Sequence, residues 1–337
     1  MAAGALTLGL AACGGGEGEG PAGTLEAAGA SFPDAYYQAV IEDYLDTEAP
    51  DADITYDPSG SGTGKEKFKS DLVDFAGSDS LVEEEDGIKA DSFYYVPTVA
   101  APITVPYNLP DVDKLQLSPD TIADIFQAEI TKWDDPAIAK DNPDAKLPST
   151  KITIAHRSDG SGTTSNFTTY LDEASDKWKL GAGDTVEWPK NSQGGEKNTG
   201  VADIVKKTEG AIGYVDLADA TELKLTAASV ENKDGKFVEP TLEATTAALE
   251  GAKVNDDLSY NPLNAAGAET YPITAPTYLL LRTEYDDAEK GELVKSFAKY
   301  LLTDGQKAAE KNNFAALPKE LADKALDQVD KVKTAKK

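Results

Sequence analysis

A chain of 337 residues that is 40% hydrophobic is long enough for two ordinary domains with buried cores. Its 60 acidic and 32 basic residues give a formal net charge of −28, which argues against nucleic acid or anionic lipid as a surface partner. One cysteine and one histidine exclude an intramolecular disulfide and the usual cysteine- or histidine-rich metal sites, so we expect no cofactor and no metal.

The single cysteine, Cys13, follows an apolar run over residues 5–12 and precedes a glycine-rich run over residues 14–20. Small residues before a cysteine and a flexible tether after it are typical of a bacterial lipoprotein signal. We therefore expect residues 1–12 to be a lipoprotein signal peptide, in full or in part, and residues 13–23 to be a lipid anchor on Cys13 with its tether. No Lys or Arg precedes the apolar run, so an incidental cysteine in a disordered N-terminus is the alternative.

From residue 24 onward, short β-rich runs alternate with helical patterns, which predicts α/β units and mainly parallel sheets. Two longer β-rich stretches, over residues 94–107 and 271–281, have the character of strands that cross between lobes. Strands are predicted over residues 54–56, 73–79, 151–155 and 211–215. Helices are predicted from Pro33, after the turn over residues 58–64 (carrying Phe68 and Leu72), from Ser118, after Thr164, around residues 201–205 and 294–301, and from Pro318 through Val332.

Three turns rich in small residues stand directly before predicted helices, and they contain Ser31, Ser61 and the run 161–163. The start of a helix offers unpaired backbone N–H donors and a partial positive charge, and flanking hydroxyl groups add donors. Each turn taken singly is more often a simple helix cap. The third is more specific, because Arg157 and Asp159 add a guanidinium and a carboxylate within six residues of Thr163.

Two enzyme signatures fail on their spacing. The run over residues 60–65 is similar to a nucleotide-binding loop, but Ser59 and Glu66 stand where that motif requires glycine and a hydroxyl residue. A serine-hydrolase elbow needs glycine two residues on either side of the serine, which neither Ser61 nor Ser161 has. We therefore expect no enzymatic activity.

Taken as a set, several segments resemble the phosphate-binding subunit of the bacterial Pst phosphate importer, in that family's order and spacing from about residue 25 to residue 318. The most specific segment is Arg-Ser-Asp-Gly-Ser-Gly-Thr over residues 157–163. The others are residues 28–33, 60–64, 74–79, 200–201, 210–215 and 271–273. Two departures are small: Ser31 stands where many members have threonine, and Ala76-Gly77 reverses a pair of small residues.

The resemblance implies a two-lobed, type II periplasmic-binding-protein fold that closes over one phosphate ion. Lobe 1 would comprise residues 24–98 and 275–337, lobe 2 residues 99–274, and the two crossing strands would act as hinges near residues 96–101 and 273–276. The implied phosphate-binding residues are Ser31, Phe32, Ser61, Asp79, Arg157, Asp159 (which would orient Arg157), Ser161, Gly162 and Thr163.

The same resemblance implies high-affinity binding of inorganic phosphate outside the cell membrane and its delivery to the permease subunits of an ABC-type importer. We expect a monomer that touches the outer face of the membrane only through its lipid. Two alternatives from other classes are a surface phosphatase acting on phosphate esters and a ligand-free surface scaffold or adhesin.

Overall fold

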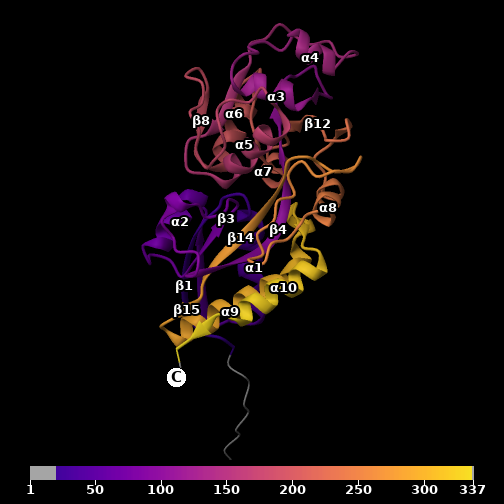
Figure 1. Ribbon diagram of the computed structural model, residues 1–337. Coiled ribbons are helices and arrows are strands. Elements are labelled where there is room, and N and C mark those ends of the chain that lie inside the picture. Colours follow the sequence, from indigo (N-terminus) through magenta and orange to yellow (C-terminus); the bar gives the residue numbers. More distant parts are fainter. Residues whose placement is uncertain (1–19, 336–337) are drawn as a thin grey trace, which may run out of the picture.

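The computed structural model describes residues 20–335, so Cys13 and the predicted signal peptide lie outside the described residues. Figure 1 shows two lobes connected by two long strands, β4 (Phe93–Thr104) and β14 (Thr274–Arg282). Over residues 20–335, no helix is both long enough and apolar enough to cross a bilayer. The two-lobed α/β architecture agrees with the sequence prediction, while the lobe borders proposed above stay a prediction.

The sheet of the first lobe has the strand order β10-β4-β14-β3-β1-β2, and β16 pairs with β4 off this path. β1 (Gly23–Gly29) is parallel to both β2 (Ala52–Asp57) and β3 (Phe75–Ser78), whereas β14 is antiparallel to both β3 and β4. This sheet therefore combines parallel and antiparallel pairs, whereas the sequence predicted mainly parallel sheets. The reason is that β4 leaves the first lobe and β14 returns to it, so the two crossing strands run in opposite directions.

The larger sheet of the second lobe has the order β11-β5-β9-β7-β8. β7 (Thr153–Arg157) is parallel to β8 (Gln193–Gly195) and β9 (Ala211–Ile212). The remaining strands are short: β5 (Pro106–Tyr107), β6 (Gln116–Leu117), β10 (Val215–Asp216), β11 (Thr226–Ala227), β12 (Ser229–Glu231), β13 (Phe237–Val238), β15 (Glu284–Tyr285), β16 (Ala315–Ala316) and β17 (Lys333–Thr334).

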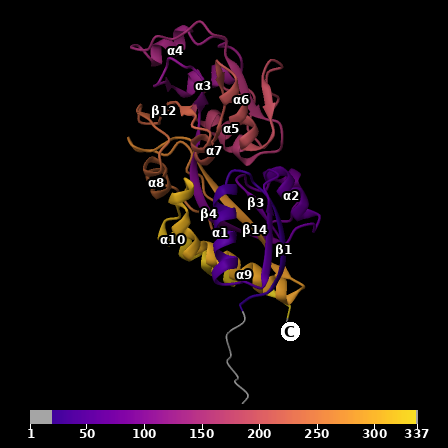
Figure 2. The same ribbon diagram turned by 180° about the vertical axis from the view of Figure 1, so that it is seen from behind.

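Helices surround both sheets, and Figure 2 shows α1, α9 and α10 packed around the first lobe. They are α1 (Asp34–Thr47), α2 (Ser61–Lys69), α3 (Pro119–Phe126), α4 (Pro136–Asp141), α5 (Gly162–Ala174), α6 (Lys197–Lys207), α7 (Leu217–Glu222), α8 (Leu242–Glu250), α9 (Ala288–Leu302) and α10 (Lys319–Asp330). α1 buries Tyr37, Val40, Ile41 and Tyr44, which recur at helical spacing and so lie on one face.

Three predicted details differ from the structure. α2 begins within the predicted turn, at Ser61, and ends at Lys69, so Leu72 lies outside it and is 64% exposed. The predicted strand over residues 211–215 is divided into β9 and β10, because β9 pairs within the second lobe while β10 pairs with β4. Val332 is buried as expected but follows the end of α10.

Candidate anion-binding site between the lobes

The first turn of α2 approaches the second lobe at glycine residues. Gly60 precedes the helix with φ = 97°, and a Cβ atom on it would stand 2.6 Å from Asp159 Oδ2 and 2.7 Å from the Gly160 carbonyl oxygen. Gly62 N donates a hydrogen bond to that same carbonyl oxygen at 3.1 Å. Glycine is therefore required here both for the backbone conformation and for the close approach of the two lobes.

The start of α5 faces this turn from the second lobe. Ser161 caps the helix, and its Oγ accepts a hydrogen bond from Thr164 N at 3.1 Å. A Cβ atom on Gly162 would stand 2.7 Å from both Asp79 Cβ and Ser61 Oγ. The first turns of α2 and α5 thus lie against each other at the junction of the lobes, where helix starts favour an anion.

Arg157 ends β7 with its side chain buried among polar partners. Its Nε donates to Asp159 Oδ1 at 2.7 Å, and its Nη2 donates to Asp159 Oδ2. Its Nη1 donates to Asn198 Oδ1 at 2.8 Å and to Thr163 Oγ1 at 3.5 Å. Burial would raise the pKa of Asp159, but the Arg157 guanidinium outweighs it and holds that pKa below its ordinary value. The ionised Asp159 carboxylate therefore fixes the Arg157 guanidinium in one orientation.

Asp79 follows β3 and is 3% exposed. Burial raises its pKa to about 7, although the nearby Thr277 hydroxyl and the Arg157 guanidinium act in the opposite direction. Asp79 Oδ1, Thr277 Oγ1 and Ser31 Oγ are buried without a hydrogen-bond partner in the described part of the chain. Buried polar atoms are rarely left unpaired. A bound ligand would supply the hydrogen bonds that these three atoms lack.

The structure brings the predicted residues together at one junction. Hydrogen bonds join Ser61 to Asp79 and Arg157 to both Asp159 and Thr163. Gly162 lies against Ser61 and Asp79, and Ser161 caps the same helix start. Ser31 and Phe32, just before α1, line an adjoining cavity of about 310 Å³ together with Lys197 and Asp216 of the second lobe. Helix starts, a buried guanidinium and one carboxylate of raised pKa suit a compact anion that carries a proton.

Comparison with known proteins agrees with this chemistry. Residues 15–305 match the family model described as a PBP superfamily domain. The phosphate-binding protein PstS of Methanocaldococcus jannaschii is 40% identical over 333 residues, covering 90% of this chain and 85% of the relative. The chain belongs to the PstS family of phosphate-binding proteins.

Some solved structures have the same fold although their sequence identity to this chain is low. The phosphate-binding protein from Stenotrophomonas maltophilia has a TM-score of 0.68 at 22% identity, covering 90% of this chain and 93% of that one. An ABC-type phosphate transport receptor from Vibrio cholerae has a TM-score of 0.59 at 15% identity, covering 87% of this chain and all of that one. These likenesses show that the PstS-family chain has the two-lobed binding-protein fold.

Sequence reasoning missed several residues around the site. Asn198, at the start of α6, accepts from Arg157 and donates from Nδ2 to Asp216 Oδ2 at 2.7 Å. Asn166 Nδ2 donates to the Asp79 carbonyl oxygen at 2.7 Å, across the lobes. Lys197 adopts φ = 61°, an uncommon conformation for a residue with a side chain, and its N–H donates to Asp159 Oδ1 at 3.1 Å. A positive φ at a residue other than glycine is backbone strain that the sequence does not reveal.

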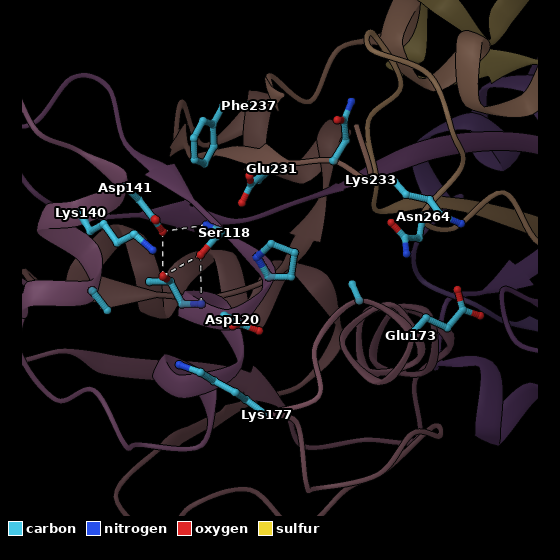
Figure 3. A pocket seen from close by; sticks show the side chains of 15 residues that line it. Ser118, Asp120, Lys140, Asp141, Glu173, Lys177, Glu231, Lys233, Phe237 and Asn264 are labelled. Atoms are coloured by element: carbon cyan, nitrogen blue, oxygen red, sulfur yellow. Dashed lines mark hydrogen bonds between the residues drawn. The ribbon is translucent and has the colours of Figure 1, made fainter. Parts of the chain in front are cut away.

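A larger cavity of about 720 Å³ lies at the surface of the second lobe, and none of these site residues lines it. Figure 3 shows the side chains that line it. Its walls mix both signs of charge, from Lys140, Lys177 and Lys233 to Asp120, Asp141, Glu173 and Glu231. The polar groups at its floor are satisfied by each other, since Asp141 Oδ2 accepts from Ser118 N and from Thr121 Oγ1 (Figure 3). Nothing there singles out one ligand. Among the described residues, no His, Cys, Asp and Glu side chains gather in a group suited to a metal ion.

Proposed function

We propose that this PstS-family protein binds inorganic phosphate between its two lobes, outside the cell membrane, and delivers it to an ABC-type importer. One observation carries the proposal: the starts of α2 and α5 meet at Asp79, whose Oδ1 is buried without a partner, and the buried Arg157 guanidinium donates to Thr163 in the first turn of α5. A fully ionised anion would be repelled by Asp79, whereas phosphate keeps a proton near neutral pH and can donate it.

In this proposal, the ligand contacts come from both lobes. The first lobe contributes Ser31, Phe32, Ser61 and Asp79, and the second contributes Arg157, Ser161, Gly162 and Thr163, with Asp159 orienting the guanidinium. Hydrogen bonds from neutral donors to a charged acceptor contribute about 1.5–3 kcal/mol each, net of the bonds that both groups lose to water. Closure of the lobes would therefore complete a shell of donors that neither lobe holds alone.

The proposed hinge lies in the two crossing strands. The pairing register of β4 and β14 shifts between Thr277 and Tyr278, because Thr277 faces Val99 while Tyr278 faces Pro97. A β-bulge of this kind increases the local twist and bends the strand. Bending there would move one lobe relative to the other, and the closed, loaded form would be the one that the permease subunits recognise.

The remaining parts of the proposal concern the oligomeric state of the protein, its lack of enzymatic activity and its attachment to the membrane. We propose that the chain is monomeric, acts without enzymatic activity and is attached to the outer face of the membrane by a lipid on Cys13. The Cys13 step is tested by mass spectrometry of the mature N-terminus from membranes. Cleavage before Cys13 and a diacylglyceryl mass on it are expected, and an unmodified cysteine or an intact signal would refute the lipid anchor.

Equilibrium dialysis of the purified protein against radiolabelled phosphate tests the central claim. We expect one phosphate per chain, displaced by unlabelled phosphate. Lack of saturable binding would favour the scaffold alternative. Release of phosphate from an ester such as p-nitrophenyl phosphate, at a rate that scales with protein concentration and is abolished in Arg157→Ala, would favour the phosphatase alternative.

A further inference from the structure

Lys65 forms a buried ionic bridge between the two lobes that the proposed phosphate contacts do not use. The side chain leaves the second turn of α2 and is 4% exposed. Its Nζ lies 2.8 Å from Asp86 Oδ2, in the 3-10 turn Glu84–Asp86 of its own lobe, and 3.1 Å from Asp184 Oδ2, between α5 and β8 of the other lobe. One ammonium group therefore pairs with one carboxylate from each lobe.

Both ends of this bridge are attached to helix starts that face the proposed ligand. Lys65 lies four residues after Ser61, which is about one turn of α2. On the opposite side, the Asp184 carbonyl oxygen accepts a hydrogen bond from the N–H of Ser161, the cap of α5, at 3.0 Å. The bridge therefore holds the first turns of α2 and α5 at the separation that the closed site requires. Figures 1 and 2 both show α2 at the edge of the first lobe that faces the second.

Opening of the lobes would separate only half of the bridge. Lys65 would keep Asp86 and the Leu81 carbonyl oxygen, to which its Nζ donates at 3.3 Å, whereas Asp184 would return to water. Burial by itself would lower the pKa of Lys65, but Asp184 and Asp86 outweigh it and raise that pKa above its ordinary value, so the ammonium stays charged at neutral pH. Opening would therefore break the Lys65–Asp184 pair and leave the Lys65–Asp86 pair intact.

We propose that Lys65 and Asp184 form a latch that sets the equilibrium between open and closed lobes and, through it, the lifetime of the bound ligand. The identity of that ligand rests on the proposed function above, whereas closure itself is measurable without it. A ligand held only by the closed form has an apparent affinity proportional to the closed fraction. Loss of the latch should therefore accelerate dissociation, while association, which begins from the open form, should change little.

The chain provides a matched control for this test. Asp86 and Asp184 pair with the same ammonium and have similarly exposed side chains, 18% and 20%, but only Asp184 belongs to the other lobe. Asp86 also accepts a hydrogen bond from Glu83 N at 2.8 Å and thereby caps a turn of the first lobe. Asp86→Asn should therefore lower the stability of the fold more than Asp184→Asn does, and Asp184→Asn should affect ligand release more.

The experiment measures phosphate association and dissociation by stopped flow, and thermal unfolding without ligand, for the wild type and both variants. We expect Asp184→Asn to dissociate about 5- to 150-fold faster, the usual range for a coupling free energy between two sites. Asp86→Asn should stay within about threefold of the wild type, because the Lys65–Asp86 pair lies within one lobe and is not separated when the lobes open. Equal acceleration in both variants, or none in Asp184→Asn, would overturn the latch.

A second measurement separates this proposal from the function on which it rests. If the wild type does not bind phosphate, the proposed function fails, and small-angle scattering of the ligand-free proteins then decides on the latch. Asp184→Asn should have a larger radius of gyration than the wild type and Asp86→Asn. Identical radii for all three proteins would exclude the latch in that case.

Discussion

Asp79 of the first lobe and Gly162 of the second lie so close that no side chain fits between them. A Cβ atom on Gly162 would stand 2.7 Å from Asp79 Cβ and 2.8 Å from Ser80 N, closer than real Cβ contacts come. The φ angle of Gly162 lies outside the left-handed region, so glycine is needed here for space and not for backbone conformation. The closed arrangement of the lobes depends on this missing side chain.

We therefore expect Gly162→Ala to hinder closure without harming either lobe. Overpacking by one methyl group costs about 1–3 kcal/mol, so phosphate affinity should fall by about 5- to 150-fold. The ligand-free protein should keep its stability, because alanine is a better helix former than glycine. Titration calorimetry and thermal unfolding give both quantities.

Gly251→Ala is the control for this prediction, because nothing lies within 4 Å of its added Cβ and its φ is also outside the left-handed region. It should bind phosphate as the wild type does. Unchanged affinity in Gly162→Ala would mean that the lobes do not close to this separation around the ligand.

Arg157→Ala should lower phosphate affinity by about 2–5 kcal/mol, the usual effect of removing a desolvated charged partner. The ligand-free protein should also lose stability, because Asp159 would lose the guanidinium that holds its pKa low and Asn198 would lose its donor. Lys207→Ala is the control, since that exposed side chain pairs only with Asp203 on the surface of α6. A calorimetric loss below about 1 kcal/mol would remove Arg157 from the site.

The sequence was sufficient to predict the placement of residues that depends only on the neighbouring chain. Ser61 and Ser161 each stand where a turn of small residues becomes a helix, and Arg157 and Asp159 are two residues apart, so their proximity follows from the chain itself. The order of strands and helices likewise follows from alternating periodicities, which predicted the α/β units and both long crossing strands, whereas the two-lobed fold was implied by the family resemblance.

Residues brought to the site only by tertiary folding could not be predicted in this way. Asn198 is 41 positions from Arg157, and its helix displays only an ordinary apolar periodicity. Nothing in the sequence near Lys65 indicates that this lysine is buried, since its partner Asp184 lies 119 positions further along the chain. The prediction for Leu72 was wrong because the end of the helix was misplaced. Helical spacing placed Leu72 in the same helix as Phe68, but α2 ends three residues before Leu72.

The raised pKa of Asp79 predicts a cost to stability at neutral pH. The folded protein holds this proton up to a pKa of about 7, whereas the ordinary carboxyl loses it near 3.8. Between these values the folded state binds more protons than the unfolded state, so the contribution of Asp79 to stability is full below pH 4 and is lost as the pH rises toward 7. Asp79→Asn cannot titrate, so its stability relative to the wild type should increase over this range and then level off.

Denaturant unfolding of both ligand-free proteins from pH 4 to pH 8 measures this difference. The comparison isolates Asp79, because Asp216 and Asp219, whose pKa values are also raised by burial, are present in both proteins. A difference in unfolding free energy that is constant with pH would show that Asp79 is ionised throughout.

The final prediction concerns why a carboxylate of this kind is kept in an anion site at all. Phosphate retains at least one proton near neutral pH and can donate it to Asp79, whereas sulfate, of the same shape, has none. Ionised Asp79 would place its lone pairs against those of sulfate, and a site built to bond one particular proton can reject an analogue lacking it by about 10⁴-fold. Asp79 would then serve selectivity more than affinity.

Asp79→Asn keeps an acceptor oxygen and adds an NH₂ group, so phosphate affinity should fall modestly while sulfate affinity rises. In the wild type, sulfate affinity should increase as the pH falls through about 7, where Asp79 gains a proton that it can donate, and in Asp79→Asn it should be flat. Both proteins are titrated with both anions at fixed salt from pH 5.5 to pH 8.5. If the wild type binds sulfate within about tenfold of phosphate at pH 8, or the variant rejects sulfate equally well, Asp79 does not set selectivity, since discrimination through a missing hydrogen bond should be far larger.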